Sequence, residues 1–531
     1  MKIPRSFAAL GIIFTRGVSA VTVAEVRGNR YLSPFSGKSF TNLTGVVTFI
    51  GFYTSLRSLE PDDDESTGES IGILGYGFGL NSAVGDIVTL DGSIWDDRPW
   101  KVFLPTTSIV DPYNVRLVSR GNPVKPVILG RATSGIIGNK DMRPPTEQYN
   151  KLDQGNVFGV PNNVASVSRF NLHLEPRKYG MDFFQSLCAE LVTIRNPTAL
   201  GRRAKDNALN SGLHLWVYGN WPVTGNNSRG GLTVTDGDAN PETLILFAPV
   251  DGTENPNTTR LGDSLTDITG VIEYISSFGL YYLRPSTAPK VKSSRSPSLP
   301  PPSAIRSDGR CSALSVAEYN LEDWAPNNSR IPIFVDHIAT YLGNPSIVFL
   351  QGIQDSSGPT DDGTVDANLT LSQLTQALEE QTGIPYDFID INPPDNNDGV
   401  ERGHNIRNAY IFNPSKVRLH HPNPGNSSVI TCVLPGPSLR FNPGRIDAPP
   451  VFEYCRKPLV AHWEMVHDEG ATFFTVNVQF KHKDALSTLQ SDPRPPGNPW
   501  INDRIAQANV TGSCHRPNPG TRQKRRHHSG R

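Results

Sequence analysis

Four segments in the C-terminal half of the chain join a short apolar run to polar side chains that hydrolytic sites use. They are residues 316–323, 347–355, 403–412 and 474–483. Hydrolysis of a phosphodiester needs a divalent cation held by carboxylate oxygens, a base that activates water, and donors that neutralise charge on the phosphate. The four segments supply asparagine, acidic, arginine and histidine side chains, which are residue types suited to those tasks.

In this order and spacing, the segments resemble the motifs of the endonuclease/exonuclease/phosphatase superfamily, the deoxyribonuclease-like phosphodiesterases. The resemblance covers residues 311–512, and residues 144–149 and 157–163 resemble the large secreted fungal-type members with N-terminal β modules. It implies a four-layer α/β sandwich, a Mg²⁺ or Ca²⁺ cofactor, and nucleic acid as the substrate.

The sequence departs from the family pattern at two decisive positions. Gly352 stands where the family has its metal-binding Glu, and Gln479 stands where it has its catalytic His. Glutamine cannot take up a proton near neutral pH. On a regular strand Gln354 shares the face of Gly352, whereas Asp355 points away unless the strand bulges. His482 lies on the face opposite Gln479. We therefore expect little or no catalysis.

The other residues at the family's site positions are polar. They are Asn320, Asn405, Arg407, Arg456 and Asn477, with Glu322 beside the first as a weak candidate metal ligand. One interpretation is a cradle that holds phosphate through amide and guanidinium donors. The other is that Asn320 and Asn477 cap strand ends or turns, while Arg407 and Arg456 form ordinary salt bridges. The sequence leaves both open.

The family's C-terminal motifs, an Asp-X-Asn pair and a final Asp-His pair, are absent. In the family they follow a stretch like 509–512, which here runs into a basic tail at 513–531. From residue 515 the tail contains no Ala, Val, Leu, Ile, Met, Phe, Tyr or Trp, so it cannot form buried strands. We expect an incomplete domain, and the abrupt change suggests a frameshifted or mis-spliced gene model.

Alternation of strands and helices is expected after a Ser/Pro-rich linker at 292–310. Helical spacing covers 333–342, and a second helix is predicted over 371–381, ending at Gly383. Strands are predicted at 313–319, 347–350, 386–391, 409–412, 459–463 and 473–480. This order is typical of an α/β sandwich.

The chain before the linker shows short alternating apolar segments separated by Gly, Asn and Asp. Examples are residues 43–50, 84–90, 213–218 and 271–275. We predict two mainly β modules, at 21–130 and 131–291, of the OB-like barrel or small-sheet type.

The N-terminus has the basic, apolar and small-residue order of a signal peptide at 1–20, although a buried first strand is the alternative. Seven Asn-X-Ser/Thr sequons agree with a secreted, extracellular glycoprotein; they begin at Asn42, Asn226, Asn257, Asn327, Asn368, Asn426 and Asn509. No apolar run reaches the length of a transmembrane helix. Among five cysteines the most local disulfide candidate is Cys432–Cys455, with separate thiols equally compatible.

The charge balance is uneven along the chain. All 531 residues together carry a formal net charge of −1, which excludes a uniformly basic nucleic-acid binder. The first twenty residues contain three basic and no acidic side chains, and residues 515–531 contain six basic and none acidic. The body between them is therefore acidic.

Two hypotheses about function follow. The first is a secreted, nuclease-like, metal-dependent phosphodiesterase whose catalysis is impaired or lost. The second is a non-catalytic extracellular protein that binds nucleic acid or glycan through its β modules, because small β barrels bind both.

Overall fold

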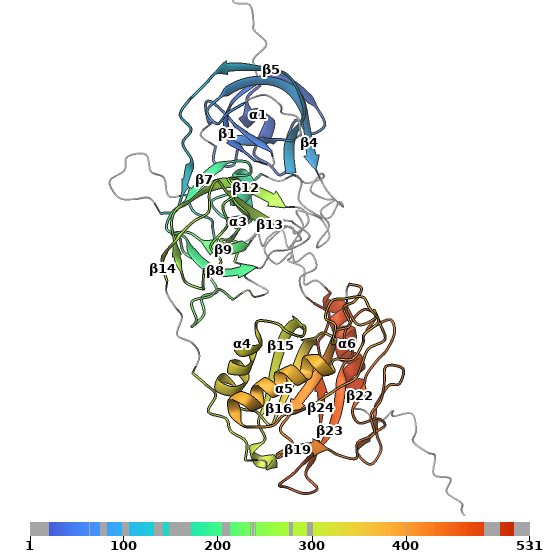
Figure 1. Ribbon diagram of the computed structural model, residues 1–531. Helices are drawn as coiled ribbons and strands as arrows, with labels where there is room; N and C mark the ends of the chain where they lie inside the picture. The colour runs from blue at the N-terminus through green and yellow to red at the C-terminus, as the bar shows by residue number, and fades with distance from the viewer. Residues whose placement is uncertain are drawn as a thin grey trace, which may run out of the picture. The chain divides into compact units, whose positions relative to one another are not determined.

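The computed structural model describes residues 21–513, except 52, 63, 75–81, 98–105, 132–141, 148–170, 172, 204–212, 234, 236–237, 239, 276–279, 295–300, 309, 400 and 483–499. The predicted signal peptide, the segment 157–163 and the basic tail from residue 514 lie outside the described residues. The chain divides into two compact units, residues 1–298 with 486–499, and residues 299–485 with 500–531 (Figure 1).

The first unit begins with helix α1 (Val23–Arg27) and a closed barrel. The barrel strands are β1 (Ser39–Ile50), β2 (Thr54–Arg57), β3 (Ser70–Ile73), β4 (Ile87–Asp97) and β5 (Thr106–Ser119), in the order β1-β2-β3-β5-β4. A capping box between Thr22 and Glu25 starts α1. The alternating apolar residues meet inside the barrel, where Val47, Leu56 and Ile94 are part of one buried cluster.

A nine-stranded sheet follows in the same unit, in the order β14-β11-β8-β9-β10-β13-β12-β7-β6. Its elements are β6 (Val127–Leu129), α3 (Gly180–Ser186), β7 (Leu191–Ile194), β8 (Thr198–Arg203), β9 (His214–Tyr218), β10 (Leu244–Leu246), β11 (Ser264–Leu265), β12 (Ile268–Ile275), β13 (Leu280–Pro285) and β14 (Val291–Ser293). Helix α3 packs Phe183 and Phe184 into the core of this sheet. The expected linker overlaps β14 at Lys292 and Ser293.

Barrel and sheet meet through polar groups within this unit. The Arg57 guanidinium pairs with Glu190 and donates to the carbonyl oxygens of Lys125 at 2.6 Å and Leu191 at 3.2 Å. The Ser70 hydroxyl donates to Glu190 at 2.7 Å. Because Arg57 and Ser70 lie on β2 and β3, these contacts cover that face of the barrel with the sheet.

The second unit contains a first sheet in the order β15-β16-β18-β17. Its elements are η5 (Cys311–Ala313), β15 (Val316–Trp324), α4 (Ile331–Asp336), the π-helical turn η6 (His337–Tyr341), β16 (Ile347–Ile353), α5 (Asn368–Thr382), β17 (Asp387–Asp390) and β18 (Arg407–Phe412). Leu371, Leu374 and Leu378 of α5 share a buried cluster with Val348 and Leu350 of β16, so the helix covers one face of this sheet.

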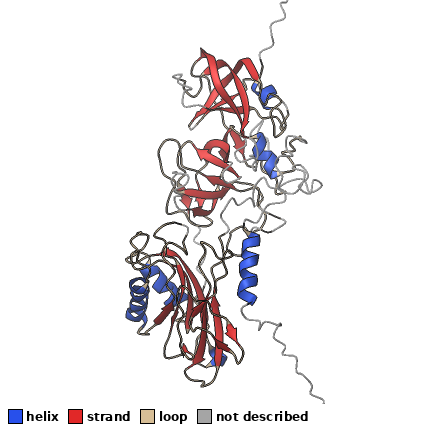
Figure 2. Cartoon of the chain, turned by 90° about the vertical axis from the view of Figure 1, so that its right-hand side faces the viewer, coloured by secondary structure: helices blue, strands red, loops and turns tan. Residues whose placement is uncertain are grey.

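A second sheet packs on the other face of the first. It contains β19 (Val417–Leu419), β22 (Gly444–Arg445), β23 (Leu459–Met465) and β24 (Thr472–Asn477), beside the small β20 (Val433–Leu434) and β21 (Ser438–Leu439) pair. Ile347 and Tyr410 of the first sheet are buried with Trp463 of the second. Helix α6 (Ile501–Ser513) adds Val510 to the cluster on the far side of β23. In Figure 2 the strands of this unit lie between α5 and α6.

The prediction of mainly β modules before the linker is confirmed by the barrel and the nine-stranded sheet. The four-layer α/β sandwich stays a prediction. The stretch 509–512 lies in α6, not ahead of further strands in the described chain. Among the described residues no disulfide joins Cys432 to Cys455. No helix among the described residues has the length and apolar character needed to span a bilayer.

Candidate functional site

Neighbouring strands β15 and β16 both bulge where the resemblance places its metal-binding residues. The pair Asn320↔Gln351 is followed by Trp324↔Ile353, so residues 321–323 oppose residue 352 alone. Glu322 and Asp323 have φ of 53° and 58°, a region that non-glycine residues rarely enter. Such backbone outliers gather at functional sites, because packing must hold them in place.

Gly352 has no room for a side chain. Its φ is +71°, and a Cβ built on it would lie 2.8 Å from the Asp323 nitrogen and 2.9 Å from Asn320 Oδ1. Asn320 Oδ1 already accepts a hydrogen bond from the Glu322 nitrogen at 3.0 Å. The bulge therefore uses the volume that the family's glutamate would fill.

Three of the described site residues have a buried polar atom without a partner: Arg407 at Nε, Arg456 and Gln479. Arg456 donates from Nη2 to Asp323 Oδ1 at 3.1 Å, while its buried Nε has no partner. Gln479 has a buried Oε1 without a partner. Glu322 is exposed, and its carboxylate is 3.5 Å from Arg330 Nη1. An anion reaching Arg456 would have to compete with Asp323.

Asn477 connects the two sheets with its side chain. Its Oδ1 accepts from Gln351 Nε2 at 2.7 Å, and its Nδ2 donates to the carbonyl oxygens of Leu350 and Ala409, both at 2.9 Å. The residue is fully buried. Because these contacts use both polar atoms of the amide, Asn477 has a structural role in this arrangement.

Asn405 holds a polar loop together. Its Nδ2 donates to Asp355 Oδ2 at 3.0 Å, to the Thr364 carbonyl at 2.8 Å and to Asp395 Oδ1 at 3.1 Å. Asp355 is fully buried, because the bulge in β16 changes the alternation that directs it away on a regular strand. His482 contacts α6 through its carbonyl, which accepts from Arg504.

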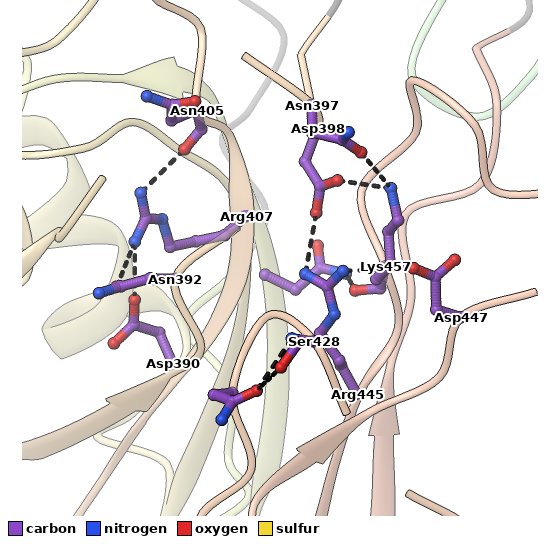
Figure 3. Close-up of polar contacts among 12 residues, drawn as sticks. Asp390, Asn392, Asn397, Asp398, Asn405, Arg407, Ser428, Arg445, Asp447 and Lys457 are labelled. Carbon is purple, nitrogen blue, oxygen red and sulfur yellow. Dashed lines mark hydrogen bonds and ion pairs between the residues drawn. The ribbon is translucent and has the colours of Figure 1, made fainter. Parts of the chain in front are cut away.

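Arg407 is held by Asp390, Asn392 and the main chain (Figure 3). Its Nη1 lies 3.1 Å from Asp390 Oδ2 and 2.9 Å from Asn392 Oδ1, and its Nη2 donates to the Asn405 carbonyl at 2.9 Å. Only 3% of the residue is exposed. Within the described residues Arg407 makes no hydrogen bond or ion pair with Asn320 or Arg456, so the site residues fall into two groups.

A second buried ion network, also drawn in Figure 3, was not expected from the sequence. Lys457 Nζ is 2.5 Å from Asp398 Oδ1, and Arg445 lies 3.6 Å from the same carboxylate and 3.2 Å from Asp447. Burial raises the pKa of Asp398, and Lys457 opposes that shift. The sequence motifs do not predict this network, because its four residues come from separate loops and strands.

The donor set does not fit a divalent cation. Mg²⁺ and Ca²⁺ are bound by several oxygens that include carboxylates. Gly352 offers none, Asn320 Oδ1 is already bonded, and the described residues hold no group of three His, Cys, Asp or Glu that could ligate a metal. Of the two neighbouring carboxylates, Glu322 is exposed and Asp323 is paired with Arg456. We derive no catalytic step through Mg²⁺ or Ca²⁺.

Comparison with known proteins finds one family model, described as a domain of unknown function, DUF8508, which matches residues 136–296. No curated protein matches the chain. The matched segment belongs to the first unit, which contains the nine-stranded sheet, and so does not include the candidate site.

Proposed function

We propose that the second unit is a non-hydrolysing relative of the deoxyribonuclease-like phosphodiesterases that retains a weak phosphodiester contact at Arg456. The observation that carries this proposal is the convergence of Asn320, Gly352 and Arg456 around Asp323. Residues far apart in sequence meet where the resemblance requires a reaction centre. The order of helix, sheet, sheet and α6 supports a four-layer sandwich of the family type.

The same geometry argues against hydrolysis by this chain. A metal-dependent phosphodiesterase needs a carboxylate ligand and a group that exchanges a proton with water. The bulge at Gly352 leaves no room for the carboxylate, and Gln479 cannot act as a base near neutral pH. What the site can offer is hydrogen-bond donation from the Arg456 guanidinium.

Hydrolysis is tested with the purified full chain, DNA and RNA, in Mg²⁺, Mn²⁺ or Ca²⁺ and in EDTA. We expect no metal-dependent turnover. Turnover that EDTA abolishes would show that a functional metal site exists and would remove the central claim.

Binding is tested by fluorescence anisotropy with a short single-stranded oligonucleotide at low salt. Arg456→Gln should weaken binding, because it removes a cation while keeping a polar side chain. Arg418→Gln is the matched control, since Arg418 pairs with Glu464 in the same unit, away from Asn320 and Gly352. Equal losses in both variants would mean that only general charge is being measured.

An alternative function for the first unit is binding of nucleic acid or glycan. The β2–β3 face, which OB-type barrels use for ligands, is covered by Glu190 and its neighbours. Exposed aromatic side chains are found instead on β4 and β5, at Trp95 and Tyr113, with Arg116 nearby. Aromatic faces stack on bases and sugars. The double variant Trp95→Ala with Tyr113→Ala should abolish oligonucleotide or oligosaccharide binding, whereas Val84→Ala should not.

Secretion of the chain is part of the same proposal. It rests on the basic and apolar order of residues 1–20 and on the sequons, whose Asn42, Asn226 and Asn509 side chains are exposed. Expression in a eukaryotic host, followed by N-terminal sequencing of the medium protein, should give a chain cleaved near residue 20. An uncleaved chain retained in the cell would contradict secretion.

A further inference from the structure

The outer edge of β24 has backbone groups that no neighbouring strand uses in the part of the chain that the structure describes. The Met465 nitrogen donates to the Ala471 carbonyl, which fixes the alternation of the β23–β24 ladder. In an antiparallel pair, successive residues point their N–H and C=O groups alternately toward and away from the partner strand. Phe473, Thr475 and Asn477 therefore bond to β23, and Thr472, Phe474 and Val476 point theirs outward.

The other side of β23 confirms this assignment. His462 stands opposite Phe474, so its backbone must point away from β24. Its nitrogen donates to Asn442 Oδ1 at 2.9 Å, and its carbonyl accepts from the His420 nitrogen at 2.9 Å. Within the described residues, the corresponding groups of Thr472, Phe474 and Val476 pair with no further strand.

This edge lacks the features that keep sheet edges apart. Natural edge strands are protected by charged residues, proline or bulges. Residues 471–480 contain no charged residue and no proline, and the β23–β24 register runs without a shift. The side chains are ordered by the sheet, since Phe474 stacks on His462 with ring centroids 4.1 Å apart.

We propose that β24 pairs with β24 of a second copy of this chain, antiparallel, across a two-fold axis at Phe474. With that axis, Phe474 faces Phe474 of the second copy, and Thr472 faces its Val476. Every outward N–H then meets an outward C=O, so the edge is complementary to itself. Because β24 has no charged side chain, it cannot attract a charged peptide. Its self-complementary hydrogen bonding therefore favours an identical strand as the partner.

The contact area of one strand edge is small beside a standard interface of about 800 Å² per partner. We therefore expect a reversible dimer whose population rises with concentration. A two-fold contact closes on itself, so the assembly should stop at two copies.

The test is sedimentation velocity of the full chain over a wide concentration range. Thr472→Pro removes one outward N–H and leaves the β23 ladder intact, because proline is tolerated on the solvent side of an edge strand. It should weaken dimerisation by at least about tenfold, as each copy loses a hydrogen bond. Thr472→Ala, which keeps the N–H, should dimerise like the wild type. A monomer at every concentration, a dimer insensitive to Thr472→Pro, or growth beyond dimers would overturn the proposal.

Residue-resolved hydrogen exchange of the wild type gives a test that depends on no variant. Protection of the Thr472, Phe474 and Val476 amides should rise with protein concentration. Protection of Phe473, Thr475 and Asn477 should not change, because their amides bond within the unit. Concentration-independent protection at both sets would contradict the paired edge.

Discussion

Two interfaces between β structures are held together by different chemistry. In the first unit the barrel meets the nine-stranded sheet through the buried Arg57–Glu190 ion pair and a small apolar cluster of Phe49, Leu191 and Val271. In the second unit the sheets meet through large side chains, including Trp463, and through the buried amides of Asn408 and Asn477. The first interface depends on charge and the second on packing and neutral hydrogen bonds.

The difference predicts how each interface fails. A buried ion pair contributes little net stability but is costly to break, because the remaining charge is desolvated. A buried amide is costly to remove because the groups that it leaves unpaired are shielded from water. The two interfaces should therefore respond differently to a neutral substitution and to pH.

The largest effect is expected from Asn477→Ala. The change leaves the Gln351 amide without its acceptor and removes one donor from each of the Leu350 and Ala409 carbonyls, which still pair in the β16–β18 ladder. An unsatisfied buried group costs roughly 1–3 kcal/mol and each lost hydrogen bond about 1 kcal/mol, so the free energy of unfolding of the second unit should fall by about 3 kcal/mol. The measurement is urea unfolding followed by labelling of buried Cys455, identified by peptide mass mapping.

Asn423→Ala is the matched control for that variant. Asn423 is exposed and its side chain donates one hydrogen bond, to the Arg440 carbonyl. The loss should stay below about 1 kcal/mol. Similar losses in both variants would show that Asn477 does not connect the sheets in solution.

A smaller effect, about 2 kcal/mol, is expected from Glu190→Gln in the first unit. Glutamine can still accept from Ser70, but Arg57 then lies buried beside a neutral group. Labelling of Cys188 reports on this unit. The exposed pair Arg177–Glu65 provides the control, since Glu65→Gln should change stability by less than about 0.5 kcal/mol. A neutral effect of Glu190→Gln would mean that charge is not what holds the barrel to the sheet.

The smallest effect is a difference between the two units in the direction in which their stability changes with pH. Burial raises the pKa of Glu69, on the loop before β3, to about 7. The folded state therefore binds the proton more tightly than the unfolded chain, and this contribution to stability is lost as pH rises from about 4.5 to about 7. Glu69→Gln should remove that loss.

In the second unit, stability changes with pH in the opposite direction. Burial and the neighbouring His420 and His421 lower the pKa of His462, whose ring centroid is 4.6 Å from that of His420. Arg418 and Glu464 are the charged groups nearby. Stability contributed by neutral His462 is present above pH 6.5 and is lost as pH falls below it. His462→Asn should flatten this acid response. Parallel pH curves for Cys188 and Cys455 labelling would contradict the contrast.

Alternation and helix signals in the sequence located most of the elements. The helix predicted over 371–381 is α5, and Gly383 ends it in the left-handed conformation. Apolar runs placed strands at β16, β18 and β23, because burial on both faces requires such runs.

The candidate site was less predictable, because it depends on backbone conformation and on contacts distant in sequence. Strand alternation cannot show that Glu322 and Asp323 adopt positive φ, nor that the β16 bulge lies at Gly352. Regular strand alternation likewise places Asp355 on the face opposite Gly352, and the bulge changes this. The ion pair of Lys457 with Asp398 joins segments 59 residues apart, which no local pattern records.

The bulge at Gly352 also limits how this position can change by mutation. Placing glutamate there by one codon change would force a side chain into a left-handed position, with its Cβ 2.8 Å from a backbone nitrogen. A carboxylate can be added at residue 352 only if residues 321–323 are rearranged at the same time. Each single substitution of that kind is therefore selected against on stability before it can be tested for activity.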